Sequence, residues 1–212
     1  LATHGAYSDQ NNIKEMKESI FEATFNLVNE CKKYKFSIFV NTGSSSEYGF
    51  KNKKMREKDV LIPNSYYSVF KSSSTLYCQY ESINSNIPIV TIRPFHVYGP
   101  FERQNRLIPV LIEKMLDNKK VKLVSPKISR DLIYIDDLID FYLKIANKKF
   151  VGEIFNLGNG KKYTIKEIYD LLKKITKYKR YNLWNTMKNR SWDQPIWYSD
   201  MSYVKKKIKW TP

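Results

Sequence analysis

Short apolar runs alternate along this chain with longer segments whose apolar residues recur at helical spacing. Five runs are rich in the β-branched and aromatic side chains that favour strands: 37–40, 87–92, 121–124, 131–135 and 153–157. Strands that alternate with helices pair in parallel, and their helices cover both faces of the sheet. The sequence therefore predicts an α/β fold built on a doubly wound parallel sheet.

The segments between the runs predict helices. Their apolar residues repeat at helical spacing in five ranges: 11–34, 65–84, 107–116, 136–146 and 164–175. Thr164 followed by Glu167 forms a capping-box pattern, which places a helix N-terminus at Thr164. Because such sheets bind ligands at the carboxyl ends of their strands, we expect the functional site in the loops after Val40 and Ile92.

Tyr67 and Lys71 are the first candidates for chemistry. They lie four residues apart on the predicted helix 65–84, so the phenol and the ammonium share one face. A free tyrosine has a pKa near 10, and a nearby cation lowers it by favouring the phenolate. The pair therefore predicts an acid/base group that exchanges a proton with a hydroxyl or a carbonyl.

This spacing is weak by itself, because about two matches are expected by chance in a chain so rich in tyrosine and lysine. Two further pairs have it: Tyr169 with Lys173, and Tyr203 with Lys207. Tyr67 differs from them because the serine-rich segment 43–49 precedes it at the end of a predicted strand. We interpret the other two pairs as core tyrosines with solvated lysines.

The net charge of +16 raises the question of a nucleic-acid partner. The lysines are spread along the chain, and dense runs such as 205–207 are short. We interpret them as solvated faces that also attract anionic substrates. The sequence thus predicts no nucleic-acid partner, although a basic nucleic-acid-binding protein remains an alternative.

Composition also bears on metals and on the compartment. Cys31 and Cys78 lie in predicted helices without metal-type spacing, and His4 and His96 are the only histidines, so no metal site is expected. No membrane-spanning run and no secretory signal are visible. We expect a cytoplasmic protein with reduced thiols and no membrane partner.

Five motifs in a fixed order carry a family resemblance. They are Gly43–Gly49 with its three serines, Tyr67–Lys71, Arg93–Pro100, Arg130–Asp137 and Phe155–Gly158. In this order and at these spacings the chain resembles the extended short-chain dehydrogenases/reductases, and most closely the NAD-dependent epimerase/dehydratase group. The resemblance implies a Rossmann-like sheet with a smaller α/β substrate-binding region. It also implies NAD or NADP as cofactor and a nucleotide-diphosphate sugar as substrate.

The resemblance assigns residues to three groups. The catalytic set is Ser44, which hydrogen-bonds the reacting oxygen, Tyr67 as acid/base, and Lys71, which binds the nicotinamide ribose and tunes Tyr67. Cofactor contacts would come from Leu1, Ala2, Thr42, Tyr67, Lys71, Pro94 and Phe95. Substrate contacts would come from Ser45, His96, Arg106, Leu107, Arg130, Arg190 and Asp193. The two arginines at 130 and 190 suit a diphosphate, and the family often has asparagine at position 96.

The family opens with a Gly-x-x-Gly-x-x-Gly turn, and none of the seven glycines has that arrangement. The resemblance therefore implies an N-terminally truncated chain that lacks the first strands of the sheet. Residues 1–98 would form the C-terminal half of the dinucleotide-binding domain. Residues 99–212 would mainly bind the nucleotide sugar, with 131–157 returning to the Rossmann sheet. Helices 11–34 and 65–84 resemble those that form a homodimer interface in this family.

The predicted function is that of an NAD(P)-dependent nucleotide-sugar epimerase or 4-keto reductase, in deoxysugar or surface-polysaccharide biosynthesis. Sugar 4,6-dehydratases of the family carry Thr-Asp-Glu where this chain has Ser44-Ser45-Ser46, which argues against elimination chemistry. The sequence does not separate epimerase from reductase. A catalytically impaired chain that only binds nucleotide sugar is the other alternative.

Overall fold

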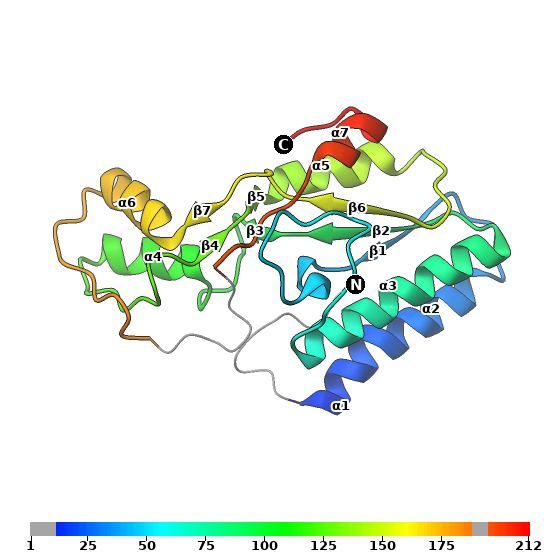
Figure 1. Ribbon diagram of the computed structural model, residues 1–212, viewed down its shortest axis with the longest axis horizontal. Coiled ribbons are helices and arrows are strands. Elements are labelled where there is room, and N and C mark those ends of the chain that lie inside the picture. Colours follow the sequence, from blue (N-terminus) through cyan, green and yellow to red (C-terminus); the bar gives the residue numbers. More distant parts are fainter. Residues whose placement is uncertain (1–11, 188–194) are drawn as a thin grey trace.

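The computed structural model describes residues 12–187 and 195–212, and it is built around a three-stranded parallel sheet (Figure 1). The strands are β1 (Phe39–Thr42), β2 (Ile89–Pro94) and β6 (Glu153–Leu157), in the order β1-β2-β6. β2 lies in the middle and pairs with both neighbours over its length. This arrangement confirms the predicted α/β class.

Helices cover both faces of the sheet (Figure 1). One face carries α3 (Tyr66–Ser85) and a helical segment made of α1 (Ile13–Met16), the π-helical turn η1 (Lys17–Glu22) and α2 (Ala23–Cys31). The opposite face carries α5 (Ile135–Ile145) and α7 (Ser202–Ile208). Among the described residues, no helix is long and apolar enough to cross a membrane.

A second unit lies beyond the carboxyl ends of the strands (Figure 1). In this α4–α6 unit, α4 (Leu107–Leu116) packs on α6 (Ile165–Thr176), and β4 (Ser129–Arg130) pairs antiparallel with β7 (Tyr163–Thr164). Between this unit and the sheet, β3 (His96–Tyr98) pairs in parallel with β5 (Leu132–Tyr134). A short 3-10 helix, η2 (Ser45–Tyr48), follows β1.

Three of the four apolar clusters in the described part of the chain fill the space between these elements. The largest lies between the sheet and α5 and α7, where Phe155 packs against Phe141 at a ring-centroid distance of 5.8 Å. A smaller cluster around Ile89 joins the sheet to α2 and α3. Leu111, Ile168 and their neighbours form a separate core between α4 and α6. Alternate residues of β2 thus face opposite cores, as a strand covered on both faces requires.

Most of the predicted elements are present, with three differences. The predicted strand 121–124 is wrong: Val121 and Leu123 point into the α4–α6 core, and the segment makes only an isolated bridge between Lys122 and Leu183. The predicted helix 11–34 is interrupted by the π-helical turn η1. β2 begins at Ile89 because Pro88 has no N–H to donate to a ladder. The division at residue 98 stays a prediction.

The capping box at Thr164 is confirmed. Thr164 Oγ1 accepts the Glu167 N–H at 3.1 Å, and the Glu167 carboxylate accepts the Thr164 N–H at 2.7 Å. We therefore predict that Thr164→Ala lowers the free energy of unfolding by about 1 kcal/mol in urea denaturation. The matched control is Thr176→Ala, because the Thr176 hydroxyl only bonds back to the Leu172 carbonyl. Equal losses in both variants would contradict the prediction.

Candidate active site

A cavity of about 830 Å³ opens at the carboxyl ends of β1 and β2. Its walls come from the sheet and from the α4–α6 unit, and parallel α/β sheets bind ligands at this position. Every described residue that the sequence assigned to the site lines it: Thr42, Ser44, Ser45, Tyr67, Lys71, Pro94, Phe95, His96, Arg106, Leu107 and Arg130. The remaining assignments, Leu1, Ala2, Arg190 and Asp193, lie outside the described residues.

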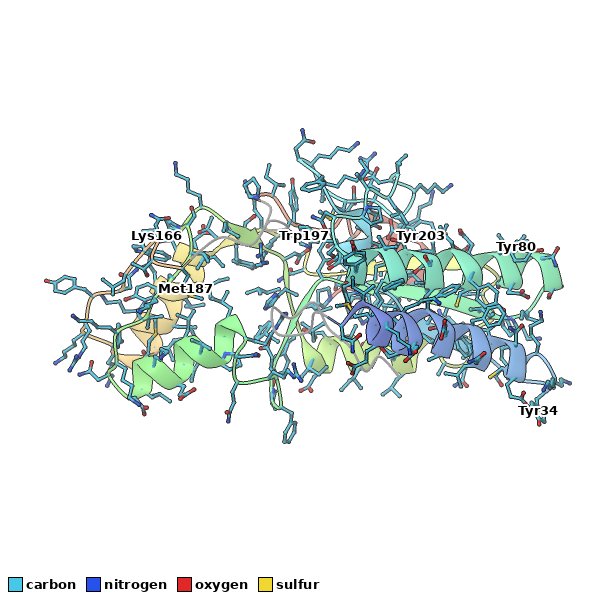
Figure 2. The ribbon with its side chains drawn as sticks, turned by 90° about the horizontal axis from the view of Figure 1, so that it is seen from below. Tyr34, Tyr80, Lys166, Met187, Trp197 and Tyr203 are labelled. Carbon is cyan, nitrogen blue, oxygen red and sulfur yellow. The ribbon has the colours of Figure 1, made fainter. Side chains whose placement is uncertain are left out.

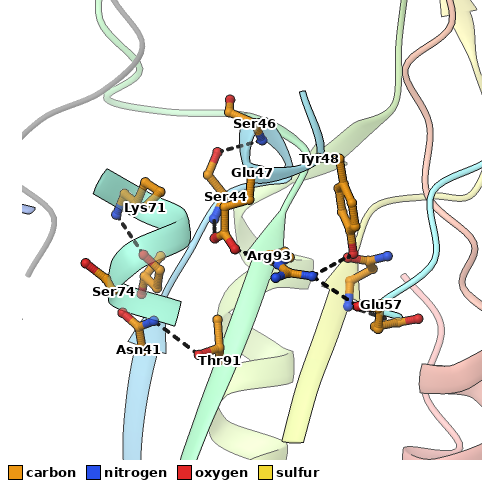
Figure 3. Close-up of polar contacts among 12 residues, drawn as sticks. Asn41, Ser44, Ser46, Glu47, Tyr48, Glu57, Lys71, Ser74, Thr91 and Arg93 are labelled. Carbon is orange, nitrogen blue, oxygen red and sulfur yellow. Dashed lines mark hydrogen bonds and ion pairs between the residues drawn. The ribbon is translucent and has the colours of Figure 1, made fainter. Parts of the chain in front are cut away.

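The serine-rich segment forms a tight turn at the end of β1 (Figure 3). Ser44 is the N-cap of η2, and its Oγ accepts the Ser46 N–H at 3.1 Å. Its own N–H donates to Glu47 Oε1 at 2.8 Å. No described residue accepts a hydrogen bond from the Ser44 hydroxyl, so its proton is available to a ligand that enters the cavity.

Tyr67 and Lys71 lie on the first two turns of α3, which Ser65 caps by accepting the Ser68 N–H. The Lys71 Nζ is 5.9 Å from the centroid of the Tyr67 ring and donates to the Thr42 carbonyl at 2.8 Å. Burial lowers the pKa of Lys71 to about 8, while the negative charge of Glu47 acts in the opposite direction. A cation and a phenol therefore share one wall of the cavity.

The two other tyrosine–lysine pairs lie away from the cavity. Tyr169 is buried in the core between α4 and α6. Tyr203 donates to the Glu153 carboxylate, and burial together with this carboxylate raises the pKa of Tyr203 to about 12. Their environments fit the interpretation of both as packing residues.

Basic residues gather at the end of the cavity near the α4–α6 unit. Arg106 lies at the N-cap of α4, and its Nε donates to Glu102 Oε1 at 3.3 Å. Arg130 ends β4, where its guanidinium donates to the Ser129 carbonyl at 2.8 Å. This part of the cavity offers guanidinium groups to an anionic ligand.

The sequence did not single out three further residues of the site. Trp197 donates from its indole N–H to Ser45 Oγ at 3.1 Å, and in Figure 2 it lies between the two ends of the molecule. No sequence signal could reveal a contact across 152 residues. Glu47 and Arg93 form a buried ion pair behind Ser44. The Ser-x-x-Glu spacing of a capping box could have pointed to Glu47.

The comparisons with known proteins identify the family of the chain. The model of the NAD dependent epimerase/dehydratase family matches residues 1–158. The chain belongs to this family, as its motifs predicted. The family description confirms NAD-type cofactor use for the family as a whole.

Two curated relatives and one solved structure illustrate the likeness. A Bacillus subtilis protein described as an uncharacterized UDP-glucose epimerase is 30% identical over 73% of this chain and 50% of its own length. A dTDP-D-glucose 4,6-dehydratase of Dictyostelium discoideum is 28% identical over 74% of this chain and 39% of its own. The Bacillus cereus UDP-glucuronic acid 4-epimerase, solved with UDP-glucuronic acid and NAD, superimposes with a TM-score of 0.91 at 28% identity, covering 100% of this chain and 68% of that one. The chain thus spans half or less of the length of these curated relatives.

His96 yields a test of the cavity's electrostatics. Burial, with Arg106 and Arg130 nearby, lowers the pKa of His96 to about 3. The unfolded chain, in which this pKa is near 6.5, binds the proton first, so the free energy of unfolding falls as the pH drops from 6.5 towards 3. The wild type should lose free energy of unfolding between pH 7 and pH 5. We predict that this loss is smaller in His96→Asn by up to about 2 kcal/mol, measured by denaturant titration at both pH values. An unchanged pH dependence in this variant would contradict the prediction.

Proposed function

We propose that the whole protein is an NAD(P)-dependent nucleotide-sugar epimerase or 4-keto reductase in which Tyr67 is the acid/base. The observation that carries the proposal is the convergence of Ser44, Tyr67 and Lys71 on one cavity at the carboxyl ends of β1 and β2. Membership of the family supports the class of reaction. Deoxysugar or surface-polysaccharide biosynthesis and a cytoplasmic location stay predictions.

Each residue of the set would have a separate task. The Lys71 ammonium favours the phenolate of Tyr67, so that Tyr67 takes a proton from a sugar hydroxyl or returns one to the carbonyl oxygen. The Ser44 hydroxyl donates to the same reacting oxygen and holds it beside the phenol. NAD(P), when bound, supplies the nicotinamide that accepts or delivers the hydride at the sugar carbon.

The cavity suits such a cofactor and such a substrate. Thr42, Pro94 and Phe95 line it beside Lys71, where they would contact the nicotinamide half of the cofactor. Arg106 and Arg130 would bind the diphosphate of the nucleotide sugar, since a guanidinium matches two phosphate oxygens at once. His96 and Ser45 would contact the sugar. UDP-glucuronic acid, bound in the B. cereus epimerase, is one substrate to test.

The environment of Ser44 argues against a dehydratase. Elimination needs a carboxylic acid and a carboxylate beside the sugar, and positions 45 and 46 are both serine. Glu47 follows these serines, but it is fully buried and engaged by Arg93 and by the Ser44 N–H. Glu102 lines the cavity, and Arg106 engages its carboxylate. Glu47 does not line the cavity. Loss of turnover with retained nucleotide-sugar binding remains the alternative reading of the same site.

Replacing Tyr67 by phenylalanine tests the acid/base role. Because the ring is kept and only the hydroxyl is lost, we predict that kcat of the whole protein falls about 100-fold or more. Nucleotide-sugar affinity, measured by calorimetry, should change less than about threefold. The matched control is Tyr203→Phe, whose hydroxyl only bonds Glu153 outside the cavity. Activity in Tyr67→Phe equal to the wild type would remove Tyr67 from this role.

A direct assay separates the two reactions. The whole protein would be given NADPH with a nucleotide-4-keto-6-deoxysugar, and in parallel NAD with ordinary nucleotide sugars. NADPH oxidation in the first case indicates the reductase, and a change of sugar configuration in the second indicates the epimerase. If neither NADPH oxidation nor a change of sugar configuration is observed, the enzyme proposal is contradicted. In that case, steeply salt-dependent binding to DNA or RNA would indicate the nucleic-acid alternative.

The outer face of α3 supports a homodimer through α2 and α3. Apolar side chains follow each other on this face at steps of three, four and seven residues: Tyr66, Val69, Leu76, Tyr80 and Ile83. Each of them is at least 42% exposed. Phe25 on α2 is 43% exposed and packs beside Tyr77 of α3. Such a stripe suits helix–helix packing against a second copy of the chain.

A charged substitution on the stripe tests this interface. We predict that Leu76→Glu converts the dimer of the whole protein to a monomer in size-exclusion chromatography with light scattering, because it would bury two uncompensated charges. Leu171→Glu on α6 is the matched control, since Leu171 is 59% exposed and Leu76 is 56% exposed. A wild-type protein that is monomeric at micromolar concentration would contradict the interface.

A further inference from the structure

Behind the cavity wall lies a buried ion pair that the acid/base scheme does not use. Arg93 Nε donates to Glu47 Oε2 at 2.7 Å, with side-chain exposures of 2% and 0% (Figure 3). The guanidinium also lies over the Tyr48 ring at 4.8 Å and donates to the Tyr48 hydroxyl and the Glu57 carbonyl. Replacing a buried ion pair by apolar side chains is often neutral or stabilising, so stability alone does not explain this one.

The pair is ionised at neutral pH. Burial raises the pKa of the Glu47 carboxyl, and Arg93 opposes that shift. The pKa of Arg93 itself is raised in the pair, and a guanidinium does not lose its proton in proteins. A neutral Glu47 would leave that guanidinium buried and uncompensated, which costs far more than ionising the carboxyl beside it.

Glu47 uses its second oxygen to hold Ser44. Oε1 accepts the Ser44 N–H at 2.8 Å and so closes the capping box of η2. The carboxylate folds back under the turn so closely that a Cβ at Gly43 would overlap Oε1. The other carboxylate oxygen is fixed to β2, which is paired on both edges. The position of Ser44 is therefore tied through Glu47 and Arg93 to the middle strand of the sheet.

The charge of Glu47 also acts on the lysine of the site. Around the Lys71 ammonium lie Tyr67 on its own helix, Glu47 of η2 with Arg93 of β2 behind it, and the Thr42 carbonyl of β1. The Tyr142 hydroxyl of α5 bonds the Thr42 side chain at 2.7 Å. Of these groups Glu47 is the one that carries a negative charge, and it favours the protonated form of Lys71.

We propose that Glu47, anchored by Arg93, is a positioning residue of the reaction that fixes Ser44 and keeps the Lys71 ammonium charged opposite Tyr67. This inference rests on the proposed function for its kinetic consequence. Its electrostatic consequence, a change in the protonation of Lys71, is measurable without turnover. Glu47 does not touch the cavity and acts through Ser44 and Lys71.

The test compares Glu47→Gln with Asp131→Asn in the whole protein. The glutamine keeps an oxygen for the Ser44 N–H and removes the charge. Asp131 is an equally buried carboxylate that accepts hydrogen bonds from Ser199, Asn159 and Gly160, and it does not line the cavity. Because Glu47→Gln leaves Arg93 unpaired, the double variant Glu47→Gln/Arg93→Met is made as well, so that a folding defect of the single variant does not end the test.

The first measurement is the titration of Lys71. Mass spectrometry monitors how the acetylation of Lys71 depends on pH, which gives the midpoint of its titration. We expect the Lys71 midpoint to move down by about half a pH unit or more in both Glu47 variants, and to stay in place in Asp131→Asn. An unchanged midpoint in the Glu47 variants, or an equal shift in Asp131→Asn, overturns the proposal. This outcome is independent of whether any nucleotide sugar is turned over.

The second measurement is kinetic. We expect Glu47→Gln to lower kcat about tenfold with KM for the nucleotide sugar within about threefold, and to move the alkaline fall of kcat to lower pH. A Glu47→Gln enzyme with the kcat and the pH profile of the wild type overturns the proposal. A wild-type protein that turns over no nucleotide sugar instead contradicts the proposed function, and the Lys71 titration then decides about Glu47.

Discussion

The parallel pairing of β2 with both β1 and β6 is the constraint on which the rest of the structure depends. Val90 and Ile92 face the core beneath α5 and α7, while Ile89 faces the one beneath α2 and α3. Since both edges of β2 are paired, its carboxyl end is held firmly, and this fixes the place of its last two residues, Arg93 and Pro94. The cavity opens there because β1 and β2 end at the same edge of the sheet.

Several polar side chains in and behind the site are costly to remove from water. Lys71 is a buried cation whose pKa falls to about 8, and His96 is a largely buried imidazole that stays neutral because its pKa falls to about 3. Both side chains lose hydration when the chain folds, and such groups cluster at functional sites more often than elsewhere. The ion pair of Glu47 and Arg93 adds to this cost. So many desolvated polar groups in and behind one cavity fit a site for binding and chemistry.

Membership of the NAD dependent epimerase/dehydratase family places this chemistry in a known setting. The names of the B. subtilis, D. discoideum and B. cereus proteins refer to different nucleotide sugars and to different reactions. In this chain the cavity wall carries serine at positions 44 to 46, and Trp197 donates a hydrogen bond to Ser45. The finer function therefore depends on these side chains rather than on the fold.

The sequence by itself determined the alternation of strands and helices, the capping box at Thr164 and the preference for Tyr67 over two other tyrosine–lysine pairs. These depend on local spacing, which a single chain displays directly. Only the tertiary structure decided that residues 121–124 pack into the core between α4 and α6 instead of forming a strand of the sheet. The same holds for the hydrogen bond from Trp197 to Ser45 and for the ion pair of Glu47 with Arg93. Each of these contacts joins segments far apart in sequence, and burial and charge pairing are settled only when the chain has folded.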